Sequence, residues 1–192
     1  QNYRTTIATM TGDEGIFTTT REGLNDLKPV MKNGSVTFAG QTHPADGNTS
    51  MIITTRDMAS TISTNNNIEI RLAGFGQART NKAFMPHAPV PASQQALRNV
   101  GISLDDITAV KTHNPFAVND IVFCRETGYD ITKMNNYGCS LIWGHPQGPT
   151  GLRAICELIE ELVIRGGGYG LFNGCAAGDS SMAAIIQVRD AT

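Results

Sequence analysis

The feature that most constrains this chain is an amphipathic segment at residues 150–165 and the three glycines that follow it at 166–168. Apolar side chains recur there with the spacing of one helix face, and the acidic side chains fall elsewhere. The apolar face consists of Leu152, Ile155, Cys156, Ile159, Leu162 and Val163. A helix with one apolar face must bury it against another element, so the sequence predicts a layered fold.

Strand-like and helix-like segments alternate along most of the chain. We expect strands at residues 50–55, 68–75, 107–112, 169–173 and 182–188, with the first of them buried. Further helices are expected at residues 20–31, 56–63, 93–100, ended by Gly101, and 118–126. The proline-rich stretch 86–91 indicates an extended loop. The last two strands follow one another closely, which favours an antiparallel pair. The prediction is therefore an α/β fold with a mixed five-stranded sheet covered by helices.

The composition of the chain changes near residue 50. Residues 1–49 are rich in Gly, Thr, Asn and Asp and indicate a surface or lid-like segment. Residues 50–192 carry the alternating pattern and are expected to form the core domain. The chain begins at Gln1 rather than Met, which would fit a processed start or one half of a split protein.

Charge and hydropathy disfavour two kinds of partner. The net charge is −2, so the chain lacks the basic surface that nucleic-acid binding needs. No apolar run approaches the roughly 20 residues that span a bilayer, and no secretory leader is recognisable.

The cysteines lack CxxC spacing, which indicates reduced thiols in a cytoplasmic protein and disfavours a metal site. They are Cys124, Cys139, Cys156 and Cys175.

Three clusters could carry chemistry. His145 lies in GHPQGPTG just before the long helix, where backbone N–H groups favour anions. Cys175 lies in NGCAAGD, and we expect a tight turn centred on it between the last two strands. His113 lies in THNPFA at a strand end, where sites of α/β sheets are built. Taken singly, each residue has a structural alternative: a histidine that binds a carbonyl, or a buried inert thiol.

The remaining cysteines and the single tryptophan favour structural roles. Cys124 and Cys156 fall within expected helices, which is typical of packing residues. Trp143 is expected in the core. Cys139 lies beside the His145 loop, and its role stays open.

These motifs, in this order, resemble the thiolases, the family of acyl-CoA acetyltransferases and 3-ketoacyl-CoA thiolases. The similarity runs along the whole chain and implies the C-terminal half of a thiolase: the end of a loop domain at 1–49 and the core domain at 50–192. The matching segments are DEGI at 13–16, ADG at 45–47, Met85 with PVPA at 89–92, NYG at 136–138 and GHPxGxTGxR at 144–153.

The resemblance implies cleavage or Claisen condensation of a 3-oxoacyl-CoA, with coenzyme A as a substrate and no permanently bound cofactor. His145 would activate a nucleophilic cysteine and, with His113, donate a hydrogen bond to a thioester oxygen. Cys175 would take a proton from the α-carbon of an acyl-CoA or return one. The backbone N–H of Ala177 would line a second oxyanion hole. The residues expected to contact substrate are Met85, Phe116 and His43.

The sequence departs from the family at the cysteine turn, which reads CAAGDSS where thiolases have CxGGG or CxGxG. The methyl group of Ala177 narrows the approach there and disfavours positive φ. The serine that many thiolases place near coenzyme A has no clear equivalent, with Thr42 or His43 nearby. HNPF at 113–116 is closer to the sterol-carrier-type thiolases, which have histidine in place of asparagine.

The nucleophilic cysteine of thiolases belongs to an N-terminal half that has no counterpart in this sequence. The resemblance therefore implies a partner polypeptide that carries it, within a homo- or hetero-oligomer. A narrower resemblance, through YGCS and GHPQGPTG, is to thiolases such as benzoylsuccinyl-CoA thiolase that work with a small zinc-binding OB-fold subunit. The alternative is a thiolase-shaped binding or assembly subunit that does not catalyse.

Overall fold

The computed structural model describes residues 4–12 and 16–190, so Asp13, Glu14 and Gly15 of the first matching segment lie outside the described residues. Its strands are β1 (Ile68–Arg79), β2 (Ile107–His113), β3 (Gly168–Ala176) and β4 (Ser180–Asp190). They form one sheet in the order β1-β4-β3-β2. Strand β2 runs parallel to β3, while β4 runs antiparallel to both of its neighbours. The mixed α/β sheet is therefore as predicted.

The prediction of five strands is wrong: among the described residues the sheet has four, which correspond to the last four of the expected strands. Met134 makes one isolated parallel bridge to Val110, on the free edge of β2 where a fifth strand would lie. The next residue, Asn135, has a φ of 54°, and its N–H binds the carbonyl of Val110 at 3.0 Å. A left-handed residue cannot continue an extended strand, so the pairing ends after one bridge.

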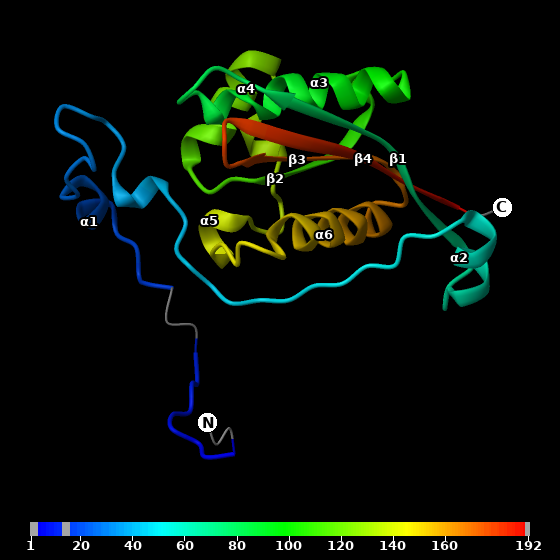
Figure 1. The fold of residues 1–192 in the computed structure, drawn as a ribbon, viewed down its shortest axis with the longest axis horizontal. Helices are drawn as coiled ribbons and strands as arrows, with labels where there is room; N and C mark the ends of the chain where they lie inside the picture. Colours follow the sequence, from blue (N-terminus) through cyan, green and yellow to red (C-terminus); the bar gives the residue numbers. More distant parts are fainter. Residues whose placement is uncertain (1–3, 13–15, 191–192) are drawn as a thin grey trace.

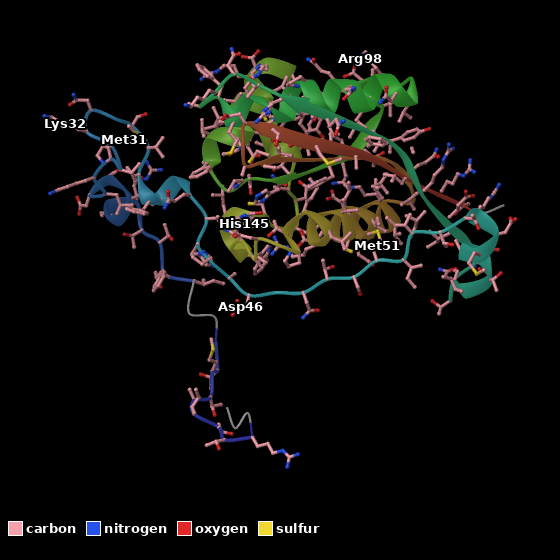
Figure 2. All side chains as sticks on the ribbon, viewed as in Figure 1. Met31, Lys32, Asp46, Met51, Arg98 and His145 are labelled. Atoms are coloured by element: carbon pink, nitrogen blue, oxygen red, sulfur yellow. The ribbon has the colours of Figure 1, made fainter. Side chains whose placement is uncertain are left out.

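The expected strand that does not form is the buried one at residues 50–55. The segment has no strand assignment, and Ile52 and Ile53 are 76% and 74% exposed. It runs in an extended path along α6 (Thr150–Ile164) toward α2 (Arg56–Ile62), as Figure 1 shows and Met51 marks in Figure 2. No described strand pairs with this segment, and its apolar side chains stay exposed.

Helices cover both faces of the sheet (Figure 1). Helices α3 (Pro89–Val100) and α4 (Ala117–Thr127) lie on one face, and α6 lies on the other. Helix α3 lies so close to β1 that a Cβ on Gly76 would come within 2.2 Å of the Ala92 carbonyl oxygen. The short helices are α1 (Arg21–Asn25) and α5 (Ser140–Trp143), and 3-10 turns span Phe38–Gly40, Met85–His87, Leu104–Asp106 and Ile131–Lys133.

Two helix boundaries differ from expectation. Helix α3 begins at Pro89, inside the stretch predicted as a loop, because proline is tolerated in a first turn where the N–H has no partner. It ends at Gly101, with φ of 78°, as predicted. Helix α1 stops at Asn25 rather than continuing to 31. It buries none of its residues, and a short helix without packing is marginal in water.

Helix α6 covers only part of its face of the sheet. Leu72 and Phe75 of β1 pair with Ile186 and Ala184, which pack beneath α6, so all four share that face. Nevertheless four apolar side chains there are about half exposed: Leu72 at 49%, Ile70 at 51%, and Phe75 and Met182 at 54%. None of the helices in the described part of the chain is long and apolar enough to cross a membrane.

Candidate active site

The three candidate residues meet at one edge of the sheet. His113 is the last residue of β2, and its partner in the parallel strand β3 is Gly174, which directly precedes Cys175. Parallel neighbours present their carboxyl ends at the same edge, so these two side chains lie close together. His145 arrives from the loop before α6 (Figure 2), and its ring centroid lies 4.3 Å from that of His113.

All three residues line a single cavity of about 350 Å³. Three other predicted site residues line it too: Met85, Phe116 and Ala177. His43 does not. Its Nε2 atom is buried next to Gly144, with no hydrogen-bond partner in the described part of the chain. Its neighbour Thr42 lines the cavity in its place, along with Gln41 and Pro115.

Residues 41–44 tie the two histidine loops together. The N–H of Thr42 donates to the carbonyl of Pro115, two residues after His113, at 2.8 Å. The N–H of His145 donates to the carbonyl of His43, also at 2.8 Å. Two backbone hydrogen bonds from adjacent residues therefore fix the separation between the loops.

Each histidine ring is held through Nδ1 by a hydroxyl group. His113 Nδ1 lies 2.9 Å from Ser140 Oγ, and His145 Nδ1 lies 2.9 Å from Thr150 Oγ1. The Thr150 hydroxyl donates its one hydrogen to the carbonyl of Pro146 at 2.8 Å. It can therefore only accept from His145, whose Nδ1 carries the proton and whose Nε2 has a free lone pair.

The surroundings keep both histidines neutral and the cysteine protonated. Burial lowers the pKa of His113 to about 4, and the nearby His145 and Arg153 contribute to that shift. Burial and Arg153 also lower the pKa of His145. Burial raises the pKa of the Cys175 thiol, although the polar side chain of Asn119 nearby opposes this. At neutral pH the cavity therefore offers an imidazole base and a thiol that can give a proton.

The tight turn lies after Cys175 rather than around it, because Cys175 is still paired within β3. Positive φ angles fall on Gly178 (81°) and Asp179 (58°), so Ala177 does not have to adopt the conformation that its methyl group disfavours. The Asp179 carboxylate accepts a hydrogen bond from the N–H of Ala83 at 3.1 Å, and Asp179 is not part of the cavity lining.

A buried carboxylate supports the end of β2. Asp120 accepts hydrogen bonds from Thr112 Oγ1 at 2.8 Å, Asn114 Nδ2 at 2.5 Å and Asn135 Nδ2 at 3.3 Å. Burial raises the pKa of this carboxyl, and the three donors oppose the shift. Thr112 and Asn114 flank His113, so this network fixes the backbone that carries the ring.

The other residues singled out from the sequence lie away from the cavity. Cys124 and Cys156 are half-buried in α4 and α6, and all four cysteines are free thiols. Cys139 precedes α5 and is 9% exposed. The expectation of a core Trp143 is wrong: it is 44% exposed, because α5 is a single turn on the surface. The described residues contain no group of His, Cys, Asp or Glu that could hold a metal ion.

Sequence reasoning missed the residues that hold the histidines. Thr150 lies within the GHPxGxTGxR segment, so a signal for it existed. Ser140 contacts a residue 27 positions away, and Asp120 lies on a helix with no unusual pattern. No local periodicity marks such contacts.

Comparison with known proteins places the chain in a family. The model of the family described as "Thiolase, C-terminal domain" matches residues 66–188. The human mitochondrial 3-ketoacyl-CoA thiolase is 35% identical over 170 residues, which is 88% of this chain and 42% of that protein. Solved structures are also similar. The Bacillus anthracis acetyl-CoA acetyltransferase has a TM-score of 0.81 at 30% identity, over 88% of this chain and 43% of that one.

The human mitochondrial 3-ketoacyl-CoA thiolase in complex with CoA has a TM-score of 0.75 at 30% identity, again over 88% of this chain and 43% of that one. This chain thus spans less than half the length of these relatives. The match covers the β2 and β3 ends that carry His113 and Cys175 as well as the His145 loop. The chain therefore belongs to the thiolase family, of which it carries the C-terminal domain.

Proposed function

We propose that this chain supplies the histidine and acid/base cysteine side of a thiolase active site, which cleaves or condenses a 3-oxoacyl-CoA. The observation that carries the proposal is that His113, His145 and Cys175 line one cavity. The names of its relatives, 3-ketoacyl-CoA thiolase and acetyl-CoA acetyltransferase, favour the same reaction class.

In the cleavage direction, a cysteine thiolate from the missing half attacks the 3-oxo carbon of the substrate. His145 takes the proton of that cysteine on Nε2, since its Nδ1 is occupied by the bond to Thr150. The bond between C2 and C3 then breaks, and its electron pair forms the enolate of the departing acyl-CoA. The Cys175 thiol gives its proton to C2, which completes the shorter acyl-CoA. The Cys175 thiolate then accepts the thiol proton of the incoming coenzyme A, whose sulfur takes the acyl group from the nucleophilic cysteine. That cysteine leaves as a thiolate and recovers its proton from Nε2 of His145, which returns both residues to their starting forms.

An enolate beside a thioester is stabilised by hydrogen-bond donors aimed at its oxygen. His113, and His145 once it has taken the cysteine proton on Nε2, are the proposed donors to one thioester oxygen, and the Ala177 N–H is the proposed donor to the second. His113 lies deepest, at 8% exposure, where a hydrogen bond is stronger than in water. Met85 and Phe116 line the same cavity and are the proposed substrate contacts.

The nucleophilic cysteine would come from an N-terminal thiolase half, either a separate chain or another part of the same one. Two features support such a partner. The α6 side of the sheet is open over Leu72, Phe75 and Met182, and the extended apolar segment 50–55 is unpaired within the described residues. A half with its own helix and strand edge would cover both. Oligomerisation, an additional OB-fold subunit and a cytoplasmic location stay predictions.

The decisive assay combines the chain with its N-terminal half, a 3-oxoacyl-CoA and coenzyme A, and follows loss of the 3-oxoacyl thioester. Cys175→Ala should lower turnover by about 10²–10⁴-fold, the usual contribution of a positioned acid/base. Cys156→Ala, a half-buried cysteine within α6, is the matched control and should leave turnover unchanged.

Unchanged turnover in Cys175→Ala would refute the assigned mechanism. Absence of turnover in the wild-type assembly, with acyl-CoA still bound, would instead favour the binding or assembly subunit. The open cavity and the position of Asp179 outside it argue against that alternative.

A further inference from the structure

We propose that Ser140 is a positioning residue for His113. Its hydroxyl donates to Nδ1 and thereby keeps the imidazole proton on Nε2, the opposite tautomer from that of His145. One ring is then fixed as a hydrogen-bond donor and its neighbour as a base.

The geometry at Ser140 carries this assignment. Ser140 is 1% exposed and is the first residue of α5. Its Oγ atom lies 2.9 Å from His113 Nδ1, which is its only hydrogen-bond partner among the described residues. A buried hydroxyl hydrogen without an acceptor is costly, and here the acceptor must be His113 Nδ1. That nitrogen is then unprotonated, so Nε2 carries the hydrogen.

The hydroxyl beside His145, that of Thr150, accepts a hydrogen bond from the ring instead of donating one, because it has another acceptor. The Thr150 hydroxyl has a backbone acceptor, the carbonyl of Pro146 at 2.8 Å, and directs its hydrogen there. His145 Nδ1 must therefore donate to it, at 2.9 Å. The two histidines thus sit against hydroxyls that differ in one respect, the presence of a competing acceptor, and their tautomers differ accordingly.

Ser140 is itself held in place from the other side. Its carbonyl accepts hydrogen bonds from the N–H of Gly144, at 3.0 Å, and from the Thr42 hydroxyl. Thr42 also donates its N–H to Pro115, near His113. The segment 41–44 therefore fixes both the serine and the loop that carries the ring, so the hydroxyl and Nδ1 keep their separation.

The consequence rests on the proposed function. In the proposed reaction, the enolate oxygen needs a permanent hydrogen-bond donor, and the nucleophilic cysteine needs a base that accepts its proton. If both rings were free to exchange tautomers, each would spend part of its time in the unsuitable form. Burial keeps the pKa of His113 near 4, so protonation does not supply the donor instead at neutral pH.

The tautomers can be measured by long-range ¹H–¹⁵N NMR on the full chain labelled with ¹⁵N-histidine, at pH 7. We expect His113 to have a protonated Nε2 and His145 a protonated Nδ1. In Ser140→Ala, the His113 nitrogens should shift toward a mixture of tautomers while those of His145 stay unchanged. Ser140→Thr keeps the hydroxyl and should keep the wild-type pattern.

The matched control is Ser93→Ala. Ser93 is also 1% exposed, but its hydroxyl has no hydrogen-bond partner among the described residues, so its loss should leave both histidines as they are. A wild-type spectrum with His113 protonated on Nδ1 would overturn the proposal, and that spectrum suffices even if Ser140→Ala does not fold. An unchanged His113 tautomer in a folded Ser140→Ala would overturn it too.

A kinetic measurement separates this proposal from the proposed function. In the complete thiolase, Ser140→Ala should lower kcat about tenfold with little change in KM, less than the roughly 10²–10³-fold loss when an oxyanion donor is removed. If the assembly has no thiolase activity but the tautomers are as expected, the proposed function fails and the role of Ser140 stands. If the assembly is active but the tautomers differ from those expected, the role of Ser140 fails and the proposed function stands.

Discussion

The α6 side of the sheet has a closed part and an open part. Over β2 and β3 it is closed by α6, where Leu158 and Leu162 are fully buried. Over β1 it is open, and Leu72 and Phe75 stay about half exposed although their cross-strand partners lie under the helix. Strands β2 and β3 of the closed part are buried almost continuously, whereas β1 in the open part begins with alternating apolar and polar residues (IEIRL). The apolar pattern of the strands predicts that this face of the sheet is covered, but it does not predict which segment covers it.

The candidate site belongs to the closed part, and its polar groups are also satisfied within the chain. Asp120 accepts hydrogen bonds from three donors, and His113 and His145 each have a hydroxyl group as hydrogen-bond partner. We therefore expect substitutions in the closed part to lower the free energy of unfolding of the chain itself. Substitutions in the open part should act mainly on its assembly.

The largest effect is expected at the centre of the closed part. Leu158→Ala removes a fully buried side chain beneath the sheet, which should lower the free energy of unfolding by about 2–5 kcal/mol. Urea denaturation followed by circular dichroism measures it. A loss below about 1 kcal/mol would mean that α6 is loosely packed and that the closed part is not closed.

The next effect concerns the network under His113. Asp120→Ala leaves the buried donors of Thr112 and Asn114 without an acceptor, while Asn135 Nδ2 keeps its bond to Thr112 Oγ1, and the cost should be about 2 kcal/mol or more. The control is Asp105→Ala. Asp105 is exposed, so its replacement should change the free energy of unfolding little in the same urea experiment. Equal effects of the two substitutions would contradict the role of the network.

Per pH unit, the effect of pH on the free energy of unfolding should be smaller, and it has a definite sign. The pKa of His113 is about 4 in the folded chain and about 6.5 in an unfolded one, so between these values the unfolded state binds more protons. Its contribution is fully present above pH 6.5 and is lost as the pH falls toward 4, by less than about 1.4 kcal/mol per pH unit.

His145 acts in the same direction, because its pKa is also lowered. His113→Asn should flatten the dependence of the urea midpoint on pH between about 4 and 6.5. A midpoint that changes as steeply with pH in the variant as in the wild type would assign the dependence to other groups.

The smallest effect on the chain itself is expected in the open part. Phe75 is 54% exposed, so Phe75→Ala should cost less than about 1 kcal/mol in the same urea experiment. Phe75→Asp should nevertheless weaken association with an N-terminal thiolase half, which analytical ultracentrifugation would detect. If Phe75→Asp left association intact, the open part would not be the surface that the other half covers.

The sequence alone determined the elements that depend on local pattern. The long helix, the strand ending at His113, the stop at Gly101 and the closing antiparallel pair follow from periodicity, glycine conformation and short connections. The family followed from ordered motifs, because the GHPxGxTGxR segment and the cysteine turn keep their spacing. These properties depend on residues that are close together along the chain, so they can be read from the sequence alone.

Only the tertiary structure decided the rest. It left residues 50–55 exposed and outside the sheet, limited Met134 to one isolated bridge, and placed Thr42 rather than His43 in the cavity. It also paired His113 with Ser140, across 27 residues, and Thr150 with the carbonyl of Pro146. Which nitrogen of a histidine carries its proton depends on where a neighbouring hydroxyl sends its one hydrogen. That is settled by distances of a few ångströms between residues whose positions in the sequence say nothing of one another.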